Sequence, residues 1–138
     1  MSRMNQAIDN VKVLKQFISP SQLHVLGAGT RGEEKGFFFD KIQELAELFT
    51  TMPKTYETDG QGDDAIVHLH YFNGSQDWYI IERDMEDEQY QAFGMADIGF
   101  GLSSSGGYIS LIELMECNIE LDLHWTPKTK REVKASHA

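Results

Sequence analysis

Cysteine is almost absent from this sequence, since Cys117 is the only one in 138 residues. A single thiol cannot form an internal disulfide, and the same count excludes a zinc site built from several thiolates. A reducing cytoplasm is therefore the expected setting. The sequence also lacks an apolar run near the roughly 20 residues that span a bilayer, and residues 1–10 lack the apolar stretch of a signal peptide. We expect a cytoplasmic protein with no membrane contact.

Basic residues are scarce in the middle of the chain. The formal net charge is −10, and the segment from Glu33 to Asp122 has 20 acidic residues against four basic ones. Such a surface repels nucleic-acid phosphates and favours cationic protein surfaces as partners, although an acidic excess also simply keeps a protein soluble. Direct contact with nucleic acid is expected at most from the basic tail. The other basic residues lie near the ends of the chain: Arg3, Lys12, Lys15 and Arg31, and Lys128, Lys130, Arg131 and Lys134.

Residues 1–52 have the apolar spacing of two amphipathic helices. The first helix is predicted over residues 4–18 and ends at Ser19-Pro20, because the residue before a proline is pushed out of the helical region. The second is predicted over residues 34–51 and is stopped by Pro53. The apolar positions are Met4, Ile8, Val11, Leu14 and Ile18 in the first helix, and Phe38, Ile42, Leu45, Phe49 and Met52 in the second.

A glycine motif lies between these helices. Residues 22–26 are compatible with a short strand, and residues 27–32 then match the dinucleotide pattern G-x-G-x-x-G. The pattern also requires a second buried parallel strand, but the candidate at residues 54–59 is polar. Glu33 and Glu34 would repel a pyrophosphate at this position. We interpret the motif as a flexible loop and expect no cofactor.

From residue 65 onward the apolar residues recur at every second position instead of at the spacing of a helix, which predicts strands. Residues 65–72 form the first, with Val67, Leu69 and Tyr71 on one face. A turn at residues 73–75 leads to an antiparallel partner at residues 78–83. A third strand is predicted over residues 90–98, where Gly94 indicates a bulge or close packing, and a last one over residues 120–125.

A short helix is predicted over residues 111–117. Ser110 and Glu113 have the spacing of a capping box, and Asn118 is a plausible left-handed stop. The chain from Thr126 onward, including the basic tail 129–138, is expected to be loose. We predict one α+β domain over residues 1–138: two N-terminal helices, a mainly antiparallel sheet of four to five strands, and a short helix before the last strand.

Residues 53–128 contain a series of short blocks that are specific when taken together. They are Pro53-Lys54-x-Tyr56, His68-Leu69-His70-Tyr71-Phe72, Trp78-Tyr79 with Glu82 and Asp84, Phe93-Gly94, Asp97-x-Gly99-x-Gly101, Gly107-Tyr108-x-Ser110-Leu111-x-Glu113-Leu114 and Asp122-Leu123-His124-Trp125-x-Pro127-Lys128. In these blocks the segment resembles an uncharacterised family of small bacterial domains found on plasmids, conjugative elements and prophages. The resemblance implies a bacterial mobile element as the setting, and it implies no activity, cofactor or catalytic residue.

Three histidines are candidate metal ligands. His68 and His70 share a strand face, and His124 lies on the outward face of the last predicted strand with Glu120 and Asp122. If the strands are neighbours, a site of two or three histidines with a carboxylate is geometrically possible. Alternating polar residues are also what any half-exposed strand shows.

The candidate contact residues are acidic, with one aromatic. Glu82 with Asp84, or with Asp97, could also serve as a pair of carboxylates for general acid–base catalysis. Acidic residues are so abundant in this sequence that such pairs are expected by chance. Phe100 between two glycines either lies exposed on a binding edge or folds back onto the core. The predicted binding residues are Glu82, Asp84, Glu86, Asp87, Glu88, Asp97 and Phe100, and no catalytic residue is predicted.

We therefore expect a non-enzymatic accessory protein of a mobile element that binds another protein. The contact regions would be the acidic segment 33–88 and the loop 99–107. A sharper version has the acidic surface imitating DNA to occupy a host defence nuclease. The alternative is a metal-dependent hydrolase that uses His68, His70 and His124. The sequence gives neither the partner nor the oligomeric state.

Overall fold

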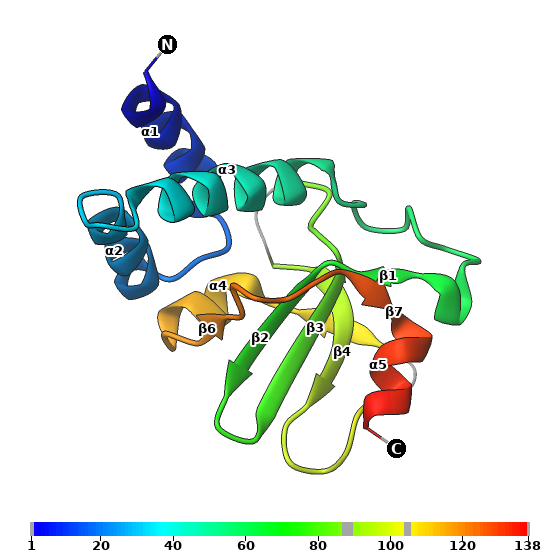
Figure 1. The fold of residues 1–138 in the computed structure, drawn as a ribbon. Helices are drawn as coiled ribbons and strands as arrows, with labels where there is room; N and C mark the ends of the chain where they lie inside the picture. The colour runs from blue at the N-terminus through cyan, green and yellow to red at the C-terminus, as the bar shows by residue number, and fades with distance from the viewer. Residues whose placement is uncertain (1, 87–89, 104–105, 138) are drawn as a thin grey trace.

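The computed structural model describes residues 2–86, 90–103 and 106–137, and it has the predicted α+β architecture. Three helices lie together over one end of a mainly antiparallel sheet (Figure 1). The strand order is β5-β4-β3-β2-β6, and β1 pairs separately with β7. The elements are α1 (Arg3–Leu14), α2 (Pro20–Gly29), α3 (Lys35–Thr51), η1 (Gly62–Asp64), β1 (Ile66–Val67), β2 (Leu69–Asn73), β3 (Gln76–Glu82), β4 (Ala92–Asp97), β5 (Gly107–Ile109), α4 (Leu111–Glu116), β6 (Glu120–Leu121), β7 (Lys128–Thr129) and α5 (Lys130–Ser136).

The strand considered at residues 22–26 and the loop interpreted from residue 27 onward are both wrong as far as Gly29, because α2 runs from Pro20 to Gly29. Pro20 occupies the first turn of that helix, where its missing N–H costs nothing. The side-chain amide of Gln22 then donates to the carbonyl of Leu121 at 2.8 Å and accepts from its N–H at 2.9 Å, so α2 is fixed against β6. Gly29 ends α2 against α3, where a Cβ would lie 2.3 Å from the ring of Phe38. Close helix packing therefore accounts for this glycine.

The main core lies between the helical layer and one face of the sheet. Phe17 and Phe49 stack with ring centroids 4.2 Å apart, and the buried hydroxyl of Tyr71 donates to the carbonyl of Phe17. Leu69 and Tyr71 are buried in this core, as the alternation predicted. The single strand predicted over residues 65–72 is wrong, because it is divided at His68 into β1 and β2, and Val67 lies in a different core from Leu69 and Tyr71. The hairpin of β2 and β3 is also confirmed, with His70 opposite Tyr79 in the register.

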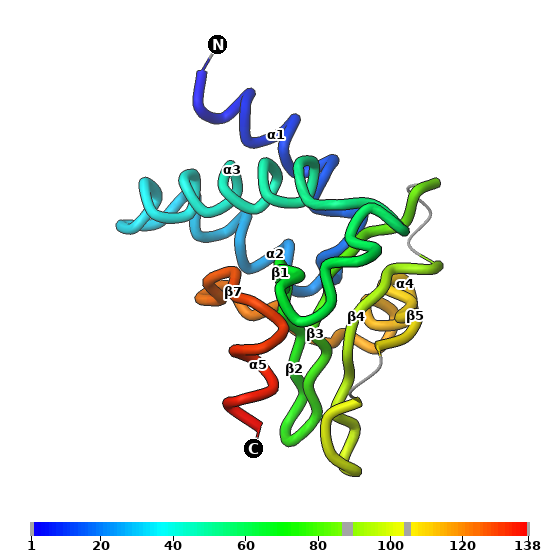
Figure 2. Tube along the Cα trace, turned by 90° about the vertical axis from the view of Figure 1, so that its right-hand side faces the viewer, coloured from blue at the N-terminus to red at the C-terminus, as the bar shows by residue number. Residues whose placement is uncertain are grey.

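The opposite face of the sheet carries a second, smaller core. Figure 2 shows α4 and α5 on opposite sides of the sheet. Val133 of α5 packs with residues of β1, β3 and β4, and Trp125 borders this cluster. The buried members are Ala65, Val67, Tyr79, Ile81, Met95 and Val133.

Two predictions about the C-terminal region are wrong. The last predicted strand, residues 120–125, stops at Leu121, because Asp122 accepts hydrogen bonds from the N–H groups of His124 and Trp125 and so turns the chain. The tail is not loose, since it forms β7 and α5. Thr129 and Glu132 form a capping box at the start of α5, and Val133 anchors the helix with 1% of its surface exposed.

The short helix α4 begins at the predicted residue and ends at Glu116, one residue before the predicted end. The Ser110 hydroxyl accepts from the N–H of Glu113 at 3.2 Å, which is one of the two hydrogen bonds of the predicted capping box. Asn118 has the predicted left-handed conformation, with a φ of 55°. Across the described residues, no helix has the length and apolar character needed to cross a membrane.

Candidate functional site

His70 is held between two carboxylates on the face of the sheet that carries the smaller core. Its Nε2 lies 2.7 Å from Asp77 of β3, and its Nδ1 lies 3.0 Å from Asp122, just after β6. The imidazole also stacks on Tyr79 at 4.8 Å between ring centroids. Both ring nitrogens are occupied, so His70 ties three segments of the chain together and has no nitrogen free to act as a base.

A second histidine extends this network. The Tyr79 hydroxyl lies 2.6 Å from Nε2 of His137, and Nδ1 of His137 lies 3.6 Å from Asp97. Burial, with the nearby charges of Asp77 and Asp97, raises the pKa of Tyr79 to about 12. We call His70, Asp77, Tyr79, Asp97, Asp122 and His137 the histidine–aspartate face. Its contacts connect the strands to the end of α5.

The three predicted metal ligands do not come together. His124 is exposed and contacts Asp122 through its backbone N–H, whereas both nitrogens of His70 are hydrogen-bonded to aspartates. His68 lines a separate small cavity between α3 and the segment after β6. Across residues 2–86, 90–103 and 106–137, no group of three or more histidine, cysteine or acidic side chains could hold a metal ion. The positions of His68, His70 and His124 therefore do not support the alternative of a metal-dependent hydrolase.

His68 lies in a cavity of about 50 Å³ whose lining includes Leu45, Leu48, Asp122 and Trp125. Its Nδ1 is buried, and burial lowers the pKa of His68 below its ordinary value. The neutral imidazole is favoured in the folded state, while the unfolded chain takes up a proton more readily. The neutral ring therefore contributes its full stability above the ordinary histidine pKa of about 6.5, which applies to the unfolded chain. This contribution is lost as the pH falls from there through the lower pKa that His68 has in the folded protein.

We expect His68→Gln to reduce the acid sensitivity of folding. The native protein should lose more free energy of unfolding between about pH 7 and about pH 5 than the variant, because glutamine does not titrate. Urea unfolding at each pH measures the difference. His24→Gln, at an exposed position of α2, is the matched control and should behave like the native protein. Equal acid losses for the native protein and His68→Gln would contradict the assignment.

The predicted contact carboxylates divide into buried and exposed groups. Glu82 is 3% exposed, and it accepts hydrogen bonds from the N–H groups of Tyr56 and Thr58 and from the Thr58 hydroxyl. Asp84 is also buried and accepts from the N–H groups of Glu86 and Tyr90. These two acids shape loops instead of facing solvent.

The remaining predicted contact residues differ in position. Glu86 is exposed, Asp97 belongs to the histidine–aspartate face, and Asp87 and Glu88 lie outside the described residues. Of the two locations considered for Phe100, the structure gives the exposed one, with 94% of its surface accessible. The loop that carries Phe100 is closed at its base, where Ser103 and Ala96 exchange two hydrogen bonds.

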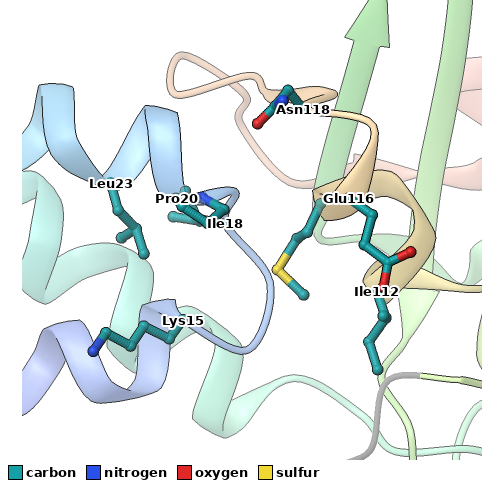
Figure 3. A pocket seen from close by; sticks show the side chains of 8 residues that line it. Lys15, Ile18, Pro20, Leu23, Ile112, Glu116 and Asn118 are labelled. Atoms are coloured by element: carbon teal, nitrogen blue, oxygen red, sulfur yellow. The ribbon is translucent and has the colours of Figure 1, made fainter.

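An apolar groove that the sequence did not predict opens between the start of α2 and α4 (Figure 3). Its volume is about 500 Å³, within the range of ligand sites, and a neighbouring groove of about 280 Å³ shares Lys15 with it. The sequence signal is that α4 is apolar on both faces: Leu111 and Leu114 are buried, while Ile112 and Met115 line the groove. The full lining is Lys15, Ile18, Pro20, Leu23, Ile112, Met115, Glu116 and Asn118.

The fold and these sites define an α+β domain whose histidines and buried acids mostly hold structure, and which has an apolar groove between α2 and α4. The chain belongs to the family described as "Protein of unknown function (DUF2958)", whose model matches residues 41–134. The matched segment contains the sheet, α4 and most of α3, whereas α1 and α2 lie outside it. Comparison with curated proteins and with solved structures finds no match.

Proposed function

We propose that the protein is a non-enzymatic accessory protein that binds another protein. The observation that carries the proposal is the open groove between α2 and α4, which is lined mainly by apolar side chains. Leu23, Ile112 and Met115 present apolar surface there, and methionine adapts readily to different partners. An amphipathic helix of a partner would place its apolar stripe in such a groove.

The charged residues at the groove give the partner helix an orientation. Lys15 directly follows α1, Glu116 belongs to α4, and the two lie on opposite walls (Figure 3). A helix with acidic residues on one flank and basic residues on the other would complement both walls. One wall comes from the segment matched by the family and the other from the N-terminal helices outside it.

An acidic contact surface is a further part of the proposal. Exposed carboxylates lie in the turn before α3 (Glu33 and Glu34) and in the loop after it (Glu57 and Asp59). The sharper version is that this surface imitates DNA and occupies a defence nuclease of the host. The mobile-element setting and the cytoplasmic location belong to the proposal too, and they rest on the family resemblance and on the single cysteine.

Site-specific photo-crosslinking tests the groove. A photoreactive benzoylphenylalanine in place of Met115 should yield a covalent adduct with a defined protein in bacteria that carry the native gene. The same photoreactive residue in place of Val25 is the matched control, because Val25 is an exposed apolar residue of α2 outside the groove lining. With the purified partner, Met115→Asp should weaken binding about tenfold or more, since a charge would enter the apolar contact.

Four outcomes contradict the proposal or its sharper version. No adduct from position 115, or the same adduct from positions 25 and 115, would remove the groove as the binding site. Binding that is insensitive to salt would remove the acidic contact. A captured partner that binds equally well in the presence of excess duplex DNA would remove DNA imitation.

A further inference from the structure

Two exposed tyrosines meet at a free edge of the sheet. Tyr108 lies in β5, which pairs with β4 on one side and has no strand on its other side in the described residues. Tyr56 comes from the loop after α3, and the two hydroxyl groups are 3.4 Å apart. Their exposed fractions are 59% for Tyr56 and 56% for Tyr108. The ring of Phe93 in β4 makes a T-shaped contact with the ring of Tyr108, at 6.0 Å between ring centroids. This contact helps to hold the Tyr108 ring in place.

The position of Tyr56 is set by a strained backbone. Its φ is 74°, a left-handed conformation that a bulky residue rarely adopts. The N–H of Tyr56 donates to one carboxylate oxygen of the buried Glu82 at 3.0 Å, and the N–H of Thr58 donates to the other at 2.9 Å. Thr55 adds a hydrogen bond to the carbonyl of Arg83. The loop is thus fixed to the end of β3, and it presents an aromatic ring where glycine or asparagine would be less strained.

The surroundings of this tyrosine pair are negative. Glu57 and Asp59 are exposed in the same loop, and the carboxylate of Glu82 lies just beneath it. The pKa of Tyr108 is raised, first by its hydrogen bond to Tyr56 and also by the charges of Glu82 and Asp59. The guanidinium of Arg83 lies over the ring of Phe49 in α3, 5.5 Å from its centroid.

We infer that Tyr56 and Tyr108 form a docking site for a lysine or arginine side chain of a partner protein, carried on an extended segment along the free edge of β5. The inference rests on the proposed function, because it names the partner chemistry of the acidic surface. The faces of aromatic rings attract cations, and the neighbouring carboxylates add long-range attraction. An extended segment can also pair with the unpaired backbone of an edge strand. An anionic or purely apolar side chain would gain neither of the two electrostatic contributions.

The test compares two short peptides that differ in one charge. One is acetyl-Thr-Val-Arg-Val-Thr-amide, and the other has citrulline, the neutral isostere, in place of arginine. Titrations followed by NMR of ¹³C-labelled tyrosine rings should show shifts at Tyr56 and Tyr108. The arginine peptide should bind about tenfold more tightly than the citrulline peptide, as expected when a cation contacts two ring faces. Binding should weaken about tenfold in Tyr108→Leu and in Tyr56→Asn.

Tyr90→Leu is the matched control, because Tyr90 is exposed to a similar degree and lies outside the pair. It should bind the arginine peptide as the native protein does. The inference is overturned by equal affinity for the two peptides, by no binding of the arginine peptide, or by the same loss in Tyr90→Leu as in Tyr108→Leu. None of these results affects crosslinking from position 115, so failure of this inference is distinct from failure of the groove.

Discussion

Replacing Gly94 by alanine is expected to destabilise the protein by about 3–5 kcal/mol, the range of a severe core substitution. Gly94 lies in β4 opposite Ile80 of β3. A Cβ at this position would lie 1.8 Å from the carbonyl oxygen of Tyr79 and 3.0 Å from the Cα of Ile80. Both obstacles are backbone atoms, which cannot move aside as a flexible side chain can. The variant would have to separate β3 from β4, the pair at the centre of the sheet, to accept one methyl group.

Thermal unfolding measures this effect, and Gly27→Ala provides the control. A loss of about 3 kcal/mol should lower Tm by about 10 °C in a chain of this length. Gly27 lies in α2, and a Cβ added there would have no neighbouring atom within 4 Å, so alanine should stabilise that helix by about 0.5–1 kcal/mol. A Tm for Gly94→Ala within a few degrees of the native value would show that β3 and β4 are not packed as described.

The sequence predicted those helices and strands that are determined by residues close to one another in the chain. The alternation of Leu69 and Tyr71 with polar neighbours predicted β2, because one face of the sheet is buried against the helices. The helix α4 was predicted from Ser110 and Asn118, since its ends depend on backbone groups within a few residues. The α+β class follows from the change of apolar period at residue 65.

Elements that depend on distant contacts could not be predicted. Residues 22–26 have no strong preference for helix over strand, and their state is decided by Gln22, which bonds to Leu121 at the other end of the chain. The polar loop 54–60 is likewise ordered by Glu82, which is 24 and 26 residues away from its two partners. Nothing in the local sequence shows that an acidic residue near the end of a strand will be sealed under a loop.

The candidate site was only partly predictable for the same reason. The sequence placed His70 on the strand face opposite Leu69 and Tyr71, and His70 lies there, but that face is covered by the smaller core instead of facing outward. The sequence did not predict that Asp77 and Asp122 would each form a hydrogen bond with a ring nitrogen of His70. These bonds depend on the register of β2 with β3 and on the turn after β6. The groove was missed entirely, since its lining comes from segments about 90 residues apart.

The segregation of charge along the chain is reduced by folding. The sequence places basic residues near both ends and acidic residues between them. In the structure Arg3 pairs with Asp40, and Arg131 and Lys134 pair with Asp64 and Asp63. Exposed pairs of this kind add little stability, typically ~0–1 kcal/mol each. They do neutralise part of the acidic segment, so the acidic surface open to a partner is smaller than the sequence indicates.

Burial of Val133 in the smaller core predicts the second large effect. Val133→Asp should destabilise the protein by about 3–4 kcal/mol, or release α5 from the sheet, because a carboxylate would enter an apolar cluster without a partner. Release of α5 would also break the contact between Tyr79 and His137. Urea unfolding gives the free energy, and hydrogen exchange of the α5 amides distinguishes local release from global loss.

Ala135→Asp is the matched control, because it places the same charge on the exposed side of the same helix. Its cost should stay near ~0.5 kcal/mol, the scale of an acidic residue placed unfavourably near a helix C-terminus. If the tail were loose, aspartate at 133 and at 135 would be tolerated equally, because neither side chain would leave water. A clear difference between the two variants therefore tests whether α5 of the basic tail packs on the sheet, with Val133 as its apolar anchor.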